Sequence, residues 1–118
     1  MFDEALKDMV TNISGGQAAV VMGFDGIPVS MFADDEEQDI ETIGMEFSVL
    51  LREVKKASEM LESGEMEEVT VRTEKMSTIL RVINEEYFVA MVIAPQGNLG
   101  KTRYSLRVLA PKLNGELS

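Results

Sequence analysis

The chain has 118 residues and a formal net charge of −10, and it contains neither cysteine nor histidine. The missing cysteines exclude a disulfide framework and a thiolate metal site, and the missing histidines remove the commonest general base and the usual zinc ligand. The negative charge argues against nucleic acid and against direct membrane binding, because both need a basic face.

A first helix is predicted over residues 2–13, closed by Gly15-Gly16 in the manner of a C-terminal cap. Its apolar side comprises Phe2, Leu6, Met9 or Val10, and Ile13. Two short strands follow, Ala18–Met22 and Ile27–Phe32, joined by a tight turn at Gly26. Because Pro28 cannot donate to a strand ladder, the second strand is expected at an edge of the sheet.

An uninterrupted long helix is predicted between Gln38 and Gly64, after the acidic run Asp34-Asp35-Glu36-Glu37. These carboxylates complement the positive end of the helix dipole, and they lack the glycine and the ligand spacing of a calcium loop. One apolar stripe, repeating at steps of three and four, must face a core. It comprises Ile40, Ile43, Phe47, Leu50, Val54, Ala57 and Leu61.

A second apolar stripe lies on nearly the opposite side of this helix. Met45, Val49 and Met60 fall there, among the charged residues Arg52, Glu53 and Lys56. On the surface of a monomer, a second apolar stripe would remain exposed to water, so we expect this side to contact another molecule. The alternative is that these are ordinary scattered apolar residues of a protein surface.

Three further strands are predicted, over Glu67–Thr73, Met76–Ile83 and Tyr87–Ala94, and the last is apolar on both sides, as a central strand would be. Asn98 is the expected N-cap of a final helix. The inward side of that helix comprises Leu99, Leu106, Leu109 and Leu113. The order helix, two strands, helix, three strands, helix predicts an α+β fold, a three-layer α/β/α sandwich around a five-stranded antiparallel sheet.

The segment Gly97-Asn98-Leu99-Gly100-Lys101-Thr102 is similar to a phosphate-binding loop but departs from it in spacing, because Pro95 stands where the first glycine belongs. A capped amphipathic helix is the simpler interpretation. Hydroxyl side chains have no histidine partner, and no sequence pattern marks a carboxylate pair for acid–base work. The sequence therefore predicts a protein that is not an enzyme, with no catalytic residue, no cofactor and no metal site.

The sequence has no apolar run of about 18 residues, so no membrane span is predicted. Its first residues, Met1-Phe2-Asp3-Glu4, are acidic and unlike a signal peptide. We therefore expect a single cytoplasmic domain over residues 1–118, which is close to the commonest domain size.

Two segments, Val20-Val21-Met22-Gly23-Phe24-Asp25-Gly26-Ile27-Pro28-Val29 and Asn98-Leu99-Gly100-Lys101-Thr102-Arg103, resemble the Roadblock/dynein light-chain superfamily, and the resemblance covers nearly the whole chain. It implies a homodimer in which the strand over residues 67–73 pairs with its copy and the two long helices lie side by side. The residues assigned to this dimer interface are Gly44, Ser48, Leu51, Val69, Thr70, Val71 and Arg72.

Among compact bacterial and archaeal members, the chain is similar to the MglB type, which stimulates GTP hydrolysis by Ras-like GTPases of the MglA type without an arginine finger. The resemblance therefore implies a regulator of a small Ras-like GTPase, and a passive dimeric scaffold is the alternative. The expected partner face comprises Met45, Val49, Arg52, Glu53, Lys56 and Met60. Which helix face serves the dimer and which serves the partner stays open.

Overall fold

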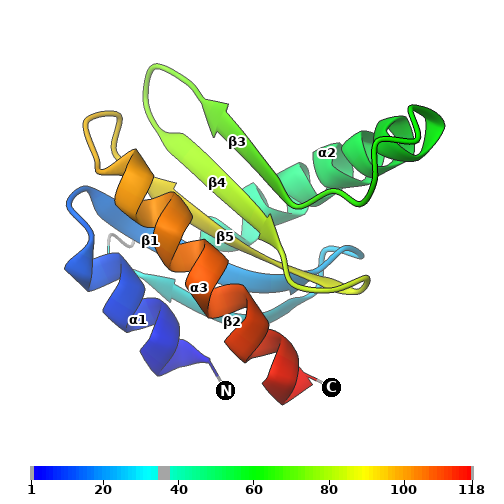
Figure 1. Ribbon diagram of the computed structural model, residues 1–118. Helices are drawn as coiled ribbons and strands as arrows, with labels where there is room; N and C mark the ends of the chain where they lie inside the picture. Colours follow the sequence, from blue (N-terminus) through cyan, green and yellow to red (C-terminus); the bar gives the residue numbers. More distant parts are fainter. Residues whose placement is uncertain (1, 35–37, 118) are drawn as a thin grey trace.

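The computed structural model describes residues 2–34 and 38–117 (Figure 1). In chain order the elements are α1 (Asp3–Asn12), β1 (Gly16–Gly23), β2 (Pro28–Ala33), α2 (Ile40–Met60), β3 (Glu68–Arg72), β4 (Ser77–Val82), β5 (Tyr87–Ile93) and α3 (Leu99–Leu117). The five strands form one antiparallel sheet in the order β2-β1-β5-β4-β3. The predicted fold class and element order are confirmed. Of the acidic run before the long helix, Asp35, Glu36 and Glu37 lie outside the described residues.

The sheet is covered on both faces, by α1 and α3 on one side and by α2 on the other (Figure 1). Successive side chains of a strand point to opposite faces, so Ala19 and Val21 of β1 pack with α1 and α3, whereas Val20 and Met22 pack with α2. Strand β5 is the central strand of the sheet and is buried on both faces, as its sequence predicts. Pro28 lies on the edge strand β2, also as predicted. None of the helices in the described part of the chain is long and apolar enough to cross a membrane.

The two helices of the first layer follow their sequence patterns closely. All five residues of the predicted apolar side of α1 are buried. Asn98 caps α3 as expected, because its Oδ1 accepts the backbone N–H of Lys101 at 3.0 Å. Leu106 and Leu113 of α3 are buried, whereas Leu99 and Leu109 are half-buried at the margin of the same core.

Helix α2 starts two residues later and ends four residues earlier than the predicted limits, Gln38 and Gly64. Asp39 is its N-cap: the carboxylate accepts the Thr42 N–H at 3.1 Å and the Thr42 hydroxyl at 2.7 Å. These hydrogen bonds lower the pKa of Asp39 because they favour the ionised form. After α2, Glu62 and Gly64 adopt positive φ angles of 52° and 92°, which turn the chain back toward β3.

The buried side of α2 differs from the prediction. The residues that face the sheet are Ile40, Gly44, Ser48 and Leu51, whereas Leu50, Ala57 and Leu61 are exposed. The reason is the small size of Gly44: a Cβ there would lie 2.8 Å from Met22 Cε and 3.3 Å from Val20 Cγ1. The helix approaches the sheet along its small residues, so it is rotated away from the side that its large apolar residues indicate.

This rotation bears on three residues of the predicted dimer interface. Gly44, Ser48 and Leu51 contact the chain's own sheet, and Ser48 and Leu51 are only 2% and 1% exposed. A residue that is already buried within one chain has no surface left to bury against a second copy. In the single chain these three residues belong to the core, so the dimer that we propose below uses other residues of α2.

Candidate protein-interaction surface

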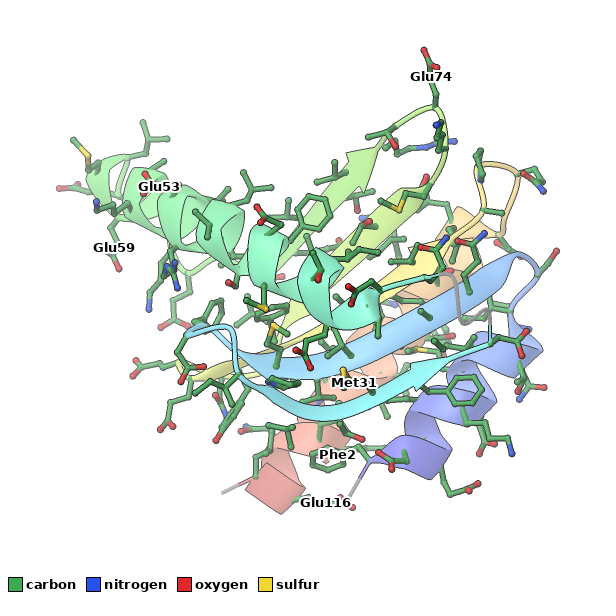
Figure 2. All side chains as sticks on the ribbon, turned by 180° about the vertical axis from the view of Figure 1, so that it is seen from behind. Phe2, Met31, Glu53, Glu59, Glu74 and Glu116 are labelled. Atoms are coloured by element: carbon green, nitrogen blue, oxygen red, sulfur yellow. The ribbon has the colours of Figure 1, made fainter. Side chains whose placement is uncertain are left out.

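The outer face of α2 is defined here as Met45, Val49, Arg52, Glu53, Lys56 and Met60. All six are exposed, and the three apolar members expose 46%, 50% and 86% of their surface in chain order. Figure 2 shows this side of the molecule, with Glu53 and Glu59 marking the C-terminal half of the helix. The sequence thus placed this second stripe on the correct side, pointing away from the sheet.

One member of the outer face also holds α2 in place. Arg52 Nη1 donates to the Phe24 carbonyl at 2.6 Å, which joins the middle of α2 to the β1–β2 turn. The turn itself is closed by Asp25, whose Oδ1 accepts the Ile27 N–H at 3.0 Å. Phe24 in turn packs on Phe88 of β5, with 5.4 Å between the ring centroids. Helix α2, which carries the outer face, is therefore held in place by its contact with the β1–β2 turn.

A second apolar surface runs along the other flank of α2, toward the edge strand β3. We call it the α2–β3 seam, and it comprises Ile43, Phe47, Leu50, Val54, Val69, Val71 and Met76. Six of these residues are half-buried and Leu50 is 37% exposed. Sequence reasoning assigned the four helical members to the core, because hydrophobicity alone does not distinguish a buried side from its half-buried flank.

The free side of β3 continues the seam. The Val82 N–H donates to the Glu67 carbonyl at 3.0 Å, so hydrogen-bonded positions fall on odd-numbered residues of this strand. The backbones of Glu68, Thr70 and Arg72 consequently point away from β4 toward the open edge. Thr70 and Arg72, both assigned to the dimer interface from sequence, are exposed at this edge, and Val69 and Val71 are half-buried beneath α2.

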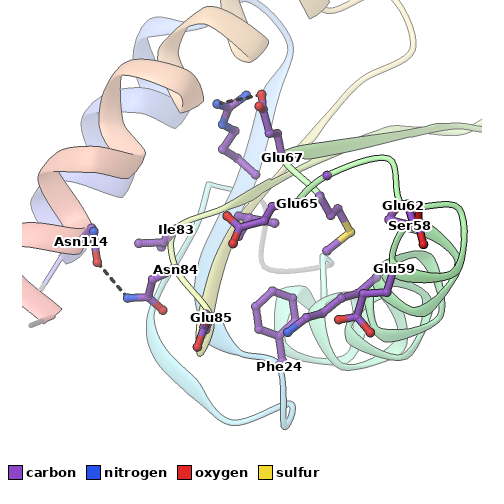
Figure 3. Close-up of a pocket in the computed structure, with 15 residues that line it drawn as sticks. Phe24, Ser58, Glu59, Glu62, Glu65, Glu67, Ile83, Asn84, Glu85 and Asn114 are labelled. Carbon is purple, nitrogen blue, oxygen red and sulfur yellow. Dashed lines mark hydrogen bonds and ion pairs between the residues drawn. The ribbon is translucent and has the colours of Figure 1, made fainter.

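A groove of about 1110 Å³ lies between the C-terminal half of α2, the α2–β3 connection and the β4–β5 turn (Figure 3). Its charged lining is dominated by Glu59, Glu62, Glu65, Glu67 and Glu85. Asn84 Nδ2 donates to Asn114 Oδ1 at 2.9 Å across one end. Among residues 2–34 and 38–117, no group of three carboxylates is placed to hold a metal ion. Sequence reasoning missed the groove because its walls come from distant segments.

The loop that is similar to a phosphate-binding motif is closed. The Asn98 N–H donates to the Ser14 carbonyl at 2.9 Å, and Lys101 Nζ donates to the Asn12 carbonyl at 3.0 Å. The Thr102 hydroxyl is buried and donates to the Asn98 carbonyl at 2.8 Å. These three donors of the loop are thus used within the chain.

These features agree with a match to a known domain: the profile of the Roadblock/LC7 domain matches residues 2–94. The chain belongs to the Roadblock/LC7 family. The family expected from the two sequence segments is thereby confirmed. A search of curated proteins found no match to the chain.

Solved structures agree with this Roadblock assignment. The chain is similar to MglC from Myxococcus xanthus, with 40% identity over 98% of both chains and a TM-score of 0.70. A Roadblock/LC7 domain from Streptomyces avermitilis shares 16% identity over 98% of this chain and 96% of that one, with a TM-score of 0.87. MglB from Thermus thermophilus shares 14% identity, covering 94% and 84%, with a TM-score of 0.83. The last two show a common fold only.

Proposed function

We propose that this Roadblock domain is a homodimeric regulator of a small Ras-like GTPase of the MglA type, and that it has no active site of its own. The observation that carries the proposal is the apolar surface that α2 leaves uncovered on two sides. The α2–β3 seam suits a second copy of the chain, and the outer face of α2 suits a different partner.

The dimer rests on the seam and the open edge of β3 together. An edge strand with unpaired backbone groups is a template for pairing, and a copy of β3 related by a two-fold axis would cover both the edge and the seam. A standard stable interface buries about 800 Å² per partner, which a strand and a long helix can supply. The proposed interface keeps Val69, Thr70, Val71 and Arg72 and replaces the three core residues of α2 with Phe47, Leu50 and Val54.

The GTPase partner is supported by the resemblance to MglB-type members, in which the Roadblock dimer reshapes the GTPase's own site. The position of Arg52 is consistent with such a mechanism. Its guanidinium is bonded to the Phe24 carbonyl, so it braces the β1–β2 turn instead of extending freely toward a partner's nucleotide. Met45 and Val49 are the apolar anchors that we assign to the GTPase contact.

The proposal is tested by single-turnover GTP hydrolysis of an MglA-type GTPase with saturating amounts of this protein. We expect acceleration by the wild type. Arg52→Ala should weaken binding while keeping the rate at saturation, and Arg107→Ala on α3 serves as the control for loss of an exposed arginine. A collapsed rate at unchanged affinity would instead place Arg52 in the transition state.

A passive scaffold is the second candidate, because stimulation of GTP hydrolysis is inferred from the MglB type alone. Identity to the MglC structure is 40%, whereas identity to the MglB structures from Thermus thermophilus and Myxococcus xanthus is 14% and 11%. Stimulation of hydrolysis, which we take from the MglB type, therefore rests on a shared fold. Binding of the GTPase without any acceleration of hydrolysis would select the scaffold.

A further inference from the structure

Strand β2 ends the sheet on the side opposite β3, and its outer backbone has no partner in the described part of the chain. The Asp34 N–H donates to the Gln17 carbonyl at 2.8 Å, which fixes the alternation of hydrogen-bonded positions along β2. Counting back in steps of two, the even-numbered residues face β1. The residues whose N–H and C=O groups point outward are Met31 and Ala33, and the count ends at Val29, where the register shifts.

This edge lacks the usual protection. Natural edge strands are guarded by charges, prolines or bulges, yet β2 contains no charged residue between Pro28 and Ala33. Pro28 and the register shift between Val21 and Met22 guard one end only. Val29 and Met31 are instead 38% and 39% exposed, and Figure 2 places Met31 on the α2 side of the strand.

The surroundings of the edge are acidic. Asp25 stands in the turn at one end of β2 and Asp34 at the other, and both are exposed. On the opposite side of the sheet, the carboxylate of Asp3 at the start of α1 accepts a hydrogen bond from the Ser30 hydroxyl. The whole chain adds a net charge of −10. A segment that approaches this edge is therefore attracted if it carries positive charge.

We propose that β2 accepts an extended segment of a partner protein as an additional strand. The open backbone groups would supply the main-chain hydrogen bonds, and apolar side chains at alternate positions of the segment would cover Val29 and Met31. Basic residues near its ends would meet Asp25 and Asp34. The site lies at the edge of the sheet opposite β3, so it does not depend on the proposed dimer.

The probe is a synthetic peptide of alternating valine and threonine with a lysine at each end, added to ¹⁵N-labelled full-length protein. We expect amide shift changes and slower hydrogen exchange at Met31 and Ala33, with Thr70 on the other edge unchanged. A peptide of the same sequence, N-methylated at alternate residues, cannot form the ladder and should not bind.

Two variants test the edge itself. Met31→Pro removes one outward N–H without adding charge, and Met31→Lys adds the charge that natural edges use as a guard. Each substitution should weaken binding of the peptide by roughly tenfold or more. Val108→Lys is the matched control, because Val108 is 41% exposed on α3. The amide spectrum reports whether each variant is folded. If the Met31→Pro protein does not fold, the Met31→Lys protein still tests the edge.

Three results would each overturn the proposal. The first is no binding of the unmethylated peptide at concentrations up to about 1 mM, or equal binding of the methylated one. The second is a set of shift changes confined to β3 or to the outer face of α2. The third is that the signals of β2 shift with protein concentration alone, which would make a second copy of this chain the occupant of the edge.

Discussion

Arg103 of α3 holds Glu68 of β3 through two parallel hydrogen bonds, from Nε to Oε1 at 2.9 Å and from Nη2 to Oε2 at 3.0 Å. The pair joins the last helix to the edge strand that we assign to the dimer. The Arg103 hydrogen bonds, helped by the arginine's charge, hold the pKa of Glu68 below its ordinary value of 4.5. The Glu68 side chain is 19% exposed and that of Arg103 is 55% exposed, so solvent screens the pair only in part.

Glu68→Gln is predicted to lower Tm at neutral pH by no more than about 5 °C, because one partly exposed pair contributes little to stability. The lowered pKa of Glu68 gives the sign of the pH dependence. Its contribution is present above the ordinary carboxyl pKa and is lost as the pH falls through the lowered value. The difference in Tm between wild type and variant should therefore vanish in acid, as measured by thermal unfolding at stepped pH.

Glu67→Gln is the matched control for this measurement. Glu67 lies next to Glu68 and is 3.9 Å from Arg81 Nη2, but its side chain is 77% exposed. Its replacement should leave Tm nearly unchanged at every pH. An equal effect of the two substitutions would mean that the loss of any local carboxylate matters, and not the bond to Arg103.

Gly44→Ala is predicted to lower the free energy of unfolding by about 1 kcal/mol without changing the mass of the assembly. Alanine gains about 1 kcal/mol of helix propensity, but the added methyl must displace the buried Met22 side chain, and such overpacking costs about 1–3 kcal/mol. Urea unfolding at fixed protein concentration measures the change.

Gly115→Ala on α3 is the control, because, apart from its chain neighbours and its own helix backbone, no atom of the described residues lies within 4 Å of a Cβ at that position. It should stabilise the protein by about 0.5–1 kcal/mol through helix propensity alone. A Gly44→Ala protein that keeps its stability but dissociates into monomers would return Gly44 to the dimer interface.

Leu50→Asp is predicted to convert the dimer into a folded monomer, because it places a charge in the α2–β3 seam. Light scattering should give the wild type twice the chain mass of 13.1 kDa and the variant the chain mass itself. Val108→Asp is the control, since Val108 is 41% exposed against 37% for Leu50. A monomeric wild type at micromolar concentration would contradict the proposed dimer.

Val49→Asp is predicted to leave the fold and the dimer intact while weakening the GTPase contact by roughly tenfold or more. Val49 is 50% exposed on the outer face of α2, so a charge there remains hydrated. Circular dichroism, light scattering and titration with the GTPase measure the three properties separately. Tyr104→Asp on α3, at a residue that is 60% exposed, should change none of them. An unfolded Val49→Asp protein would show that this face is needed for the fold.

Much of the fold could be predicted from sequence because its signals are local. The apolar repeat of α1, the doubly apolar run of β5 and the cap at Asn98 each depend on neighbouring residues only. Pro28 predicted an edge strand in the same way, and its alternating neighbours Val29 and Met31 were the signal that could have indicated an exposed apolar edge.

The sequence by itself therefore determined the elements, their order, the antiparallel sheet and the exposure of the second stripe of α2. Only the tertiary structure decided how α2 is rotated, because Gly44 owes its burial to a close approach to Met22 and Val20 and not to its own hydrophobicity. It alone also brought Arg52 to the Phe24 carbonyl and Arg103 to Glu68, since these contacts join residues that are 28 and 35 positions apart along the chain.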